Sequence, residues 1–226
     1  YYQSTARLDN VTYASLLLDL GRYHQLMGEY PLAEKDIRAS ISLYQKYAGD
    51  KSADYAYALN TLALLYQTMG NFGEAEAALL HALNIREGLN QQNTAEYSTL
   101  LQNLASLYQL QEEYGKAESF MARSLELDEQ LLGNEHPQFV IGLENLATLY
   151  QKKKDYAKAI VQLEQARITI EKGAGKNHPT YATVLSNLGA LYQDMGQYEL
   201  SEKMWNESVA LRLQMLGEDH PDYARA

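Results

Sequence analysis

A repeat of 42 residues runs through the sequence, and no insertion breaks its register. Each period carries leucine at two registers: Leu17, Leu59, Leu101, Leu143 and Leu185, and Leu20, Leu62, Leu104, Leu146 and Leu188. An aromatic residue recurs at Tyr13, Tyr55, Tyr97, Phe139, Tyr181 and Tyr223. A fixed period of this length is typical of solenoids, in which one unit cannot bury its apolar face alone and stacks on the next. The period therefore predicts one continuous array.

Each unit is expected to hold two amphipathic helices. Residues 53–70 bring apolar side chains to one helical face at three- and four-residue spacing: Tyr55, Leu59, Leu62 and Tyr66. Residues 73–89 do the same with Ala75, Leu79, Ala82, Leu83 and Ile85. Gly70, in the short turn between them, suits a left-handed backbone. No segment alternates with a period of two, so the predicted fold class is all-α.

The predicted architecture is a right-handed α-solenoid superhelix of five antiparallel helix-turn-helix hairpins and the start of a sixth. The repeats of this single array are expected near 10–51, 52–93, 94–135, 136–177 and 178–219, with 220–226 opening a further repeat. Small residues let the two helices of a hairpin approach closely: Ala33, Ala75, Ala117, Ala159 and Ser201. Larger residues one turn later fill the remaining space: Ile37, Leu79, Met121, Leu163 and Trp205. The one tryptophan is therefore expected to pack in the core and not to stack on a ligand.

Helix starts are also marked at one register of the repeat. Ser52 and Thr94 are predicted N-caps, and later repeats carry His-Pro pairs there: His136–Pro137, His178–Pro179 and His220–Pro221. Regular histidines could suggest a metal site. Equivalent loop residues of stacked repeats lie in a line, however, and do not converge on one ion. Helix entry is the favoured role, and no metal or other cofactor is predicted.

Composition excludes several functional classes. The formal charge of −10 and the lack of a lysine or arginine block disfavour nucleic acid as a partner. The absence of cysteine excludes disulfides and thiolate zinc sites, and no stretch is long and apolar enough to span a membrane. No Ser-His-Asp order, phosphate-binding glycine loop or carboxylate pair is present, so no enzyme activity is expected. Without an initiator Met or a signal-peptide layout, the chain is expected to be a cytoplasmic fragment of a longer protein.

The order L-x2-L-[AG]-x2-Y…A-x3-Φ…[AS] resembles the tetratricopeptide repeat, with Leu at the usual Trp position. The segments "AL.IRE" at 82–87 and "LG..HP" at 132–137 and 216–221 are similar to the longer repeat variant of kinesin light chains. "HPDYA" at 220–224 and "MGQY" at 195–198 resemble bacterial proteins that join such repeats to a caspase-like CHAT protease domain. The resemblance implies a scaffold whose first helices line a concave groove that takes peptides.

Carried onto this sequence, the groove register selects one face of each first helix. Its predicted lining residues are Arg22, Gln25, Tyr57, Asn60, Leu64, Gln67, Gln102, Asn103, Gln109, Glu144, Asn145, Gln151, Asn187 and Gln193. The carboxylate clamp that grips acidic chaperone tails needs a lysine in the first row of this face. The first row here holds Ser15, Tyr57, Thr99, Ile141 and Thr183, so that clamp is not expected.

Glutamine occupies one register of that face in all five repeats: Gln25, Gln67, Gln109, Gln151 and Gln193. We call this set the amide row. Each amide offers donors and an acceptor, so the amide row suits the main chain of an extended peptide. Two simpler origins of the row stay open, because glutamine is a neutral helix former and duplication copies residues by descent.

The leading prediction is a non-catalytic scaffold that binds a partner protein or extended peptide in this groove, with Tyr57, Leu64 and Arg22 giving local selectivity. One alternative is the sensor arm of a larger enzyme of the CHAT protease kind, with an attached or associated effector domain. Another alternative is a receptor for a short signalling peptide. The identity of the partner and the oligomeric state are left open.

Overall fold

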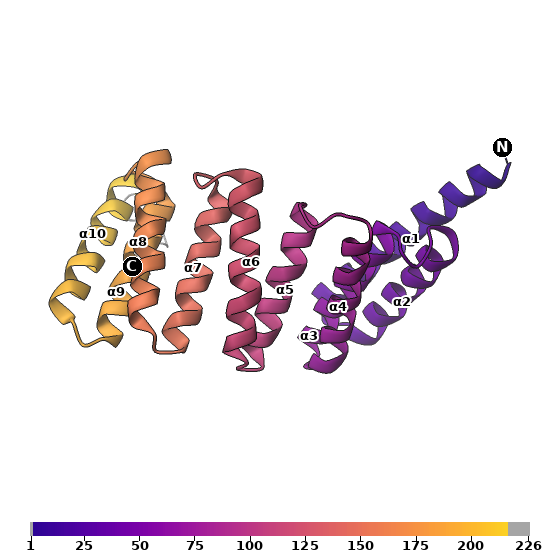
Figure 1. Ribbon diagram of the computed structural model, residues 1–226, viewed down its shortest axis with the longest axis horizontal. Helices are drawn as coiled ribbons and strands as arrows, with labels where there is room; N and C mark the ends of the chain where they lie inside the picture. Colours follow the sequence, from indigo (N-terminus) through magenta and orange to yellow (C-terminus); the bar gives the residue numbers. More distant parts are fainter. Residues whose placement is uncertain (1, 217–226) are drawn as a thin grey trace. The chain divides into compact units, whose positions relative to one another are not determined.

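The computed structural model describes residues 2–216, with side chains described over 10–215. The described residues form helices and connecting turns, without a strand. The helices are α1 (Tyr2–Leu26), α2 (Tyr30–Tyr47), α3 (Ala53–Thr68), α4 (Phe72–Gly88), α5 (Ala95–Leu110), α6 (Tyr114–Leu132), α7 (Pro137–Lys152), α8 (Tyr156–Gly173), α9 (Pro179–Asp194) and α10 (Tyr198–Leu216) (Figure 1). The predicted all-α class of consecutive hairpins is therefore confirmed. The predicted opening of a sixth repeat at 220–226 lies outside the described residues.

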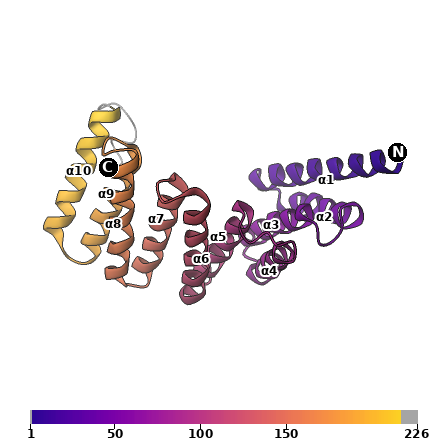
Figure 2. The same ribbon diagram turned by 45° about the horizontal axis from the view of Figure 1, so that its top comes forward.

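The chain divides into two compact units, Tyr1–Phe120 and Met121–Ala226. In the first unit, α1 packs on α2 and α3 packs on α4, while α2 and α4 contact the next first helices, α3 and α5. In the second unit, the pairs are α7 with α8 and α9 with α10, and α8 contacts α9. Figures 1 and 2 show this stack of antiparallel helix pairs within each unit.

The predicted leucine and aromatic rows form the core from the second repeat onward. Leu62, Leu104, Leu146 and Leu188 are all at most 6% exposed, and Tyr55, Tyr97, Phe139 and Tyr181 are at most 8% exposed. The prediction is wrong for the first repeat, where Tyr13 and Leu20 are 54% and 42% exposed. The reason is that each later first helix follows a second helix that covers this face, whereas α1 is the first helix described.

The predicted helix starts are confirmed. Ser52 and Thr94 accept hydrogen bonds from the backbone N–H groups of Tyr55 and Tyr97 at 3.2 and 3.3 Å. His136 and His178 do the same through Nδ1, at 3.1 and 3.3 Å from the N–H groups two residues later. Pro137 and Pro179 open α7 and α9. The third pair, His220–Pro221, lies outside the described residues.

The turn inside each hairpin keeps one backbone conformation whatever residue occupies it. Gly28, Gly70 and Gly196 have positive φ angles of 77°, 78° and 72°. Glu112 and Lys154 stand at the same register and adopt φ of 60°. This left-handed conformation costs a non-glycine residue about 1–2 kcal/mol, so two of the five turns are strained.

Close packing inside the hairpins depends on a matched pair of residues. Ala33, Ala75, Ala117 and Ala159 have no exposed surface, as predicted for the small residue of the interface. Trp205 is half-buried, and its indole lies so close to Gly189 that a Cβ built there would be 2.9 Å from Nε1. At the registers of this pair, the second and fourth repeats combine an alanine with a leucine, Ala63 with Leu79 and Ala147 with Leu163. Glycine in α9 therefore makes room for the tryptophan.

Candidate functional site

The candidate site is the polar surface of the first helices, which we call the first-helix face. In the first unit it comprises the predicted residues of α1, α3 and α5: Arg22, Gln25, Tyr57, Asn60, Leu64, Gln67, Gln102, Asn103 and Gln109. In the second unit it comprises those of α7 and α9: Glu144, Asn145, Gln151, Asn187 and Gln193. Within the first unit, α1 contacts α3 and α3 contacts α5, so residues of neighbouring repeats lie side by side.

Exposure divides the predicted site residues into three groups. Arg22, Tyr57, Leu64, Asn145 and Gln193 are exposed. The remaining amides and Glu144 are half-buried, except for Asn60, which is only 9% exposed. A partner lying on this face would therefore contact the exposed group directly. Asn60 would act mainly through the residue to which it is hydrogen-bonded, Asn103.

The amide row bonds across the repeats. The Nε2 of Gln25 donates to Thr68 Oγ1 at 3.1 Å, and the Nε2 of Gln67 donates to Ser106 Oγ at 3.2 Å. In the second unit, Gln151 Nε2 donates to Asp194 Oδ2. These bonds give the amide row a structural role that the sequence pattern did not predict.

A second set of polar bonds accompanies the first at each of these helix junctions. Asn103 Nδ2 donates to Asn60 Oδ1 at 2.8 Å between α5 and α3, and Asn187 Nδ2 donates to Glu144 Oε1 at 2.8 Å between α9 and α7. Between α1 and α3, Arg22 Nη1 donates to the hydroxyl of Tyr57 at 3.3 Å. Each of the three first-helix junctions described within a unit is thus held by two side-chain hydrogen bonds.

The sequence contains the residue types that make these bonds, but the bonded residues are not at the same register of the 42-residue repeat. Several of them join residue i to residue i+43, one position beyond the 42-residue repeat, as with Gln25 and Thr68 or Asn60 and Asn103. Position 110, which would continue this pattern for Gln67, is a leucine, so Gln67 bonds to Ser106 instead. Comparing rows offset by one residue would have paired the amides with their partners.

The amides keep hydrogen-bonding capacity beyond these links. Each cross-repeat bond uses one N–H of its glutamine, and a primary amide has two N–H groups and a carbonyl oxygen. The Oε1 of Gln67 is buried and accepts no hydrogen bond from the described residues. Gln109 and Gln193 make no side-chain hydrogen bond within the part of the chain that the structure describes.

Charge on the first-helix face is mixed and partly suppressed. Burial raises the pKa of Glu144 above its usual range, and the hydrogen bond from Asn187 opposes this shift. Arg22 lies 3.8 Å from Asp19 and is exposed, so the pair is screened by solvent. Among the described residues, no group of three His, Cys, Asp or Glu side chains could hold a metal ion. No described helix combines the length and the apolar character needed to cross a membrane.

A family model described as the tetratricopeptide repeat matches residues 12–88, 96–167, 139–214 and 180–226, which together span nearly the whole chain. A search of curated proteins gives no match.

Solved structures with the same fold come from several sources. The nearly identical TPR-like repeats assigned to a kinesin light chain of Podosopora anserina superpose with a TM-score of 0.82 at 20% identity, covering 92% of this chain and 98% of that one. BtubC (BKLC) of P. vanneervenii gives 0.66 at 23% identity, with 96% and 94% coverage. A Rap protein complexed with competence and sporulation factor gives 0.65 at 15% identity, covering 90% of this chain and 55% of that one. At these identities the likeness extends to the fold alone.

Proposed function

The chain belongs to the tetratricopeptide repeat family, and from this premise we propose that it is a non-catalytic scaffold that captures an extended segment of a partner protein on its first-helix face. Members of this family typically serve as protein–protein interaction scaffolds. The observation that carries the proposal is the unused capacity of the amide row. Among the described residues, the side-chain amides of Gln109 and Gln193 make no hydrogen bond, and the buried Oε1 of Gln67 has no partner.

An unpaired buried acceptor is unfavourable, costing about 1–3 kcal/mol relative to a satisfied one. A main-chain N–H of a bound segment would satisfy the Gln67 oxygen after a rotation of the terminal amide that gives up the Nε2 bond to Ser106. The second N–H of the same side chain would remain for a main-chain carbonyl. Each such bond contributes only about 0.5–1.5 kcal/mol net, so affinity requires several repeats acting together.

Selectivity is assigned to the exposed residues beside the amides. Tyr57 and Leu64 are 44% and 36% exposed and offer apolar surface to a side chain of the segment. Arg22 holds the hydroxyl of Tyr57 from the neighbouring helix, which limits the orientation of the ring. The side chain that packs between Tyr57 and Leu64 would be apolar, because both contribute mainly carbon surface.

A second candidate is a receptor for a short signalling peptide. It is favoured by one observation, that the Rap protein sharing this fold was solved in complex with competence and sporulation factor. Such a receptor would use the same face but bind a free peptide without flanking protein. The third possibility, a sensor arm of a larger enzyme with a CHAT-type protease, stays a prediction.

The test uses the glutamines that have no structural partner among the described residues. Peptides selected from a displayed random library against the full chain supply a ligand whose affinity can be measured by titration calorimetry. Replacing Gln109 or Gln193 with Ala should weaken binding about 2- to 12-fold each, corresponding to one lost bond of about 0.5–1.5 kcal/mol. The controls are Ala substitutions at Glu129 and Glu202, which lie on second helices. Unchanged affinity in both glutamine variants, with unchanged thermal stability, would refute the proposal.

A further inference from the structure

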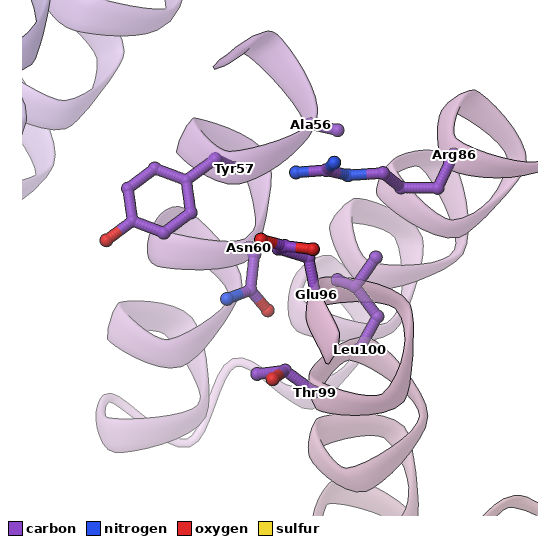
Figure 3. Close-up of a pocket in the computed structure, with 7 residues that line it drawn as sticks. All are labelled: Ala56, Tyr57, Asn60, Arg86, Glu96, Thr99 and Leu100. Atoms are coloured by element: carbon purple, nitrogen blue, oxygen red, sulfur yellow. The ribbon is translucent and has the colours of Figure 1, made fainter. Parts of the chain in front are cut away.

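A pocket at one end of the first-helix face contains a buried cation. The pocket encloses about 90 Å³ in the first unit, where α3, the end of α4 and the start of α5 meet. Tyr57 and Asn60 of α3 line it, together with Arg86 of α4 and Glu96 and Thr99 of α5. Figure 3 shows the Arg86 side chain reaching from α4 toward α3, with the Glu96 carboxylate on the other side of the space beside Asn60.

Arg86 is buried without an anionic partner among the described residues. Its side chain is only 8% exposed. Its Nη1 donates to Gln91 Oε1 at 2.6 Å, and its Nη2 donates to the carbonyl of Ala53 at 3.4 Å. Both acceptors are neutral, and no carboxylate of the described residues lies within the 4.0 Å of an ion pair. A buried charge is expensive unless an opposite charge pairs with it.

The fold does not require a charge at this position. The same register holds Tyr44 in the first repeat and Ile170 in the fourth, each 5% exposed, while the third repeat has the buried Asp128 and the fifth has Arg212. An apolar residue can therefore fill the space between hairpins. Arg86 replaces a stabilising apolar contact with an unpaired cation that faces a pocket, which indicates that the cation serves binding.

We propose that this pocket binds a carboxylate carried by the partner segment, in particular the side chain of an aspartate or glutamate. This inference rests on the proposed function, because the segment must lie on the first-helix face for its side chain to enter. A guanidinium has five N–H donors in a planar fork that matches a carboxylate, and the two neutral acceptors occupy only part of it. Asn60 can add a donor, since its Oδ1 is held by Asn103 while its Nδ2 has no partner among the described residues.

Two further features define the strength of the site. The pocket includes the first turn of α5, where the helix dipole favours a negative charge, and the last turn of α4, where the dipole favours the cation of Arg86. Glu96 acts in the opposite direction, because its carboxylate is exposed and lines the same pocket. The equivalent residue of a later repeat is Gln138, so the charge of Glu96 is not needed for the helix. The carboxylate of Glu96 repels an anion in the pocket and therefore weakens its binding. The repulsion is stronger for a doubly charged anion, so the pocket favours a singly charged group.

The experiment uses blocked alanine pentapeptides as probes. One has a central glutamate, one has a central glutamine, and one has no acidic side chain but a free C-terminal carboxylate. The readout is the Nε–H resonance of Arg86 in the isotope-labelled full chain, identified by its loss in Arg86→Ile. The glutamate peptide is expected to shift this resonance and to bind at least tenfold more tightly than the glutamine peptide. A response only to the free C-terminus would overturn the assignment to a side chain.

The variants are residues that other repeats use, so they are expected to fold. Arg86→Ile and Arg86→Tyr should reduce binding of the glutamate peptide to the level of the glutamine peptide. Glu96→Gln should strengthen binding of the glutamate peptide about two- to fivefold, as expected for removal of one exposed like charge. Equal binding of the two peptides to the native chain, or glutamate binding that survives Arg86→Ile, would overturn the proposal. The proposal would also be overturned if Glu96→Gln lowered the thermal stability as much as Arg86→Ile does. Glu96 would then be the internal ion-pair partner of Arg86.

Failure of this inference can be told apart from failure of the proposed function. Gln109 lies ten residues, about 15 Å, beyond Thr99 along α5, out of reach of a pentapeptide centred on the pocket. Gln109→Ala should therefore weaken the library-selected peptides and leave both pentapeptides unchanged, whereas Arg86→Ile should weaken the glutamate pentapeptide. If the pentapeptides do not bind but sodium acetate shifts the Arg86 resonance, the pocket is confirmed and capture of an extended segment is refuted. If neither acetate nor the glutamate peptide shifts it, the pocket is refuted.

Discussion

Replacing Gly189 with Ala is expected to destabilise the last hairpin, although alanine is the better helix former. The new Cβ would lie 2.9 Å from Trp205 Nε1 and 3.0 Å from Cδ1 and Cε2. Carbon atoms in favourable contact are about 3.5–4.0 Å apart, so the overlap is about half an ångström or more. The indole is a rigid ring and cannot yield at one atom. Either Trp205 must leave its rotamer or α9 and α10 must separate.

The magnitude follows from two opposing effects. Overpacking of this kind costs about 1–3 kcal/mol. Alanine recovers about 0.5–1 kcal/mol of helix stability that glycine forfeits. The expected net loss is therefore about 1 kcal/mol. Gly173, at the end of α8, is the matched control in the same unit, because a Cβ there would meet only Glu135 Cβ at an ordinary 3.8 Å. Gly173→Ala should be neutral or slightly stabilising.

A double-mutant cycle makes the reasoning sharper. Trp205→Leu combined with Gly189→Ala recreates the pairing of Ala147 and Leu163. In the leucine background, Gly189→Ala should change sign and stabilise the protein by about 0.5–1 kcal/mol. Urea unfolding followed by circular dichroism measures these changes, because the cycle removes the one tryptophan. Hydrogen exchange of the α9 amides gives the local free energy where the array departs from two-state unfolding. Stabilisation by Gly189→Ala in the native background, or no change of sign, would refute the packing argument.

Four other substitutions test three separate features. Glu112→Gly and Lys154→Gly should each raise the free energy of unfolding by about 0.5–1 kcal/mol in urea titrations, because glycine relieves a left-handed turn; a loss of stability in both would contradict the strain. Asn103→Ala should cost about 1–3 kcal/mol, measured by hydrogen exchange in α3 and α5, because it leaves the buried Oδ1 of Asn60 unpaired; exchange rates like those of the native chain would show that the bond is dispensable. Since burial raises the pKa of Glu144, the folded state binds its proton more readily than the unfolded chain, and stability is lost as pH rises through the folded pKa. Glu144→Gln should therefore raise the melting temperature at pH 7 and flatten its dependence on pH between acidic and neutral conditions, whereas an unchanged pH profile would argue against a raised pKa.

Much of the fold was predictable from the sequence because its determinants repeat. The turn conformation is an example, since the register places a left-handed residue at Glu112 and Lys154 although neither residue type favours it. The caps at His136 and His178 follow from proline at the next position. The exposed ring of Tyr13 could not be predicted in this way, because burial depends on which helix precedes each repeat and not on the row itself.

The candidate site was less predictable. The amides were expected on one face of the first helices, but the hydrogen bonds that they make within each unit depend on the offset between neighbouring hairpins. That offset pairs residue i with residue i+43, and it cannot be read from the period. The pocket at Arg86 was also missed, because an arginine near the end of an amphipathic helix is usually solvated. Only the packing of α3 and α5 around it shows that the charge is buried.

Within each unit, the two hydrogen bonds at a first-helix junction restrict the motion of one hairpin relative to the next. A single link would act as a pivot, about which one hairpin could swing relative to the next. On α3, the two linking residues Asn60 and Gln67 are seven positions apart, and on α7 Glu144 and Gln151 have the same spacing. Seven residues span about 10 Å along a helix. Two points this far apart resist swinging and twisting together. Within each unit, the linked amides therefore stand at fixed positions relative to one another on neighbouring first helices.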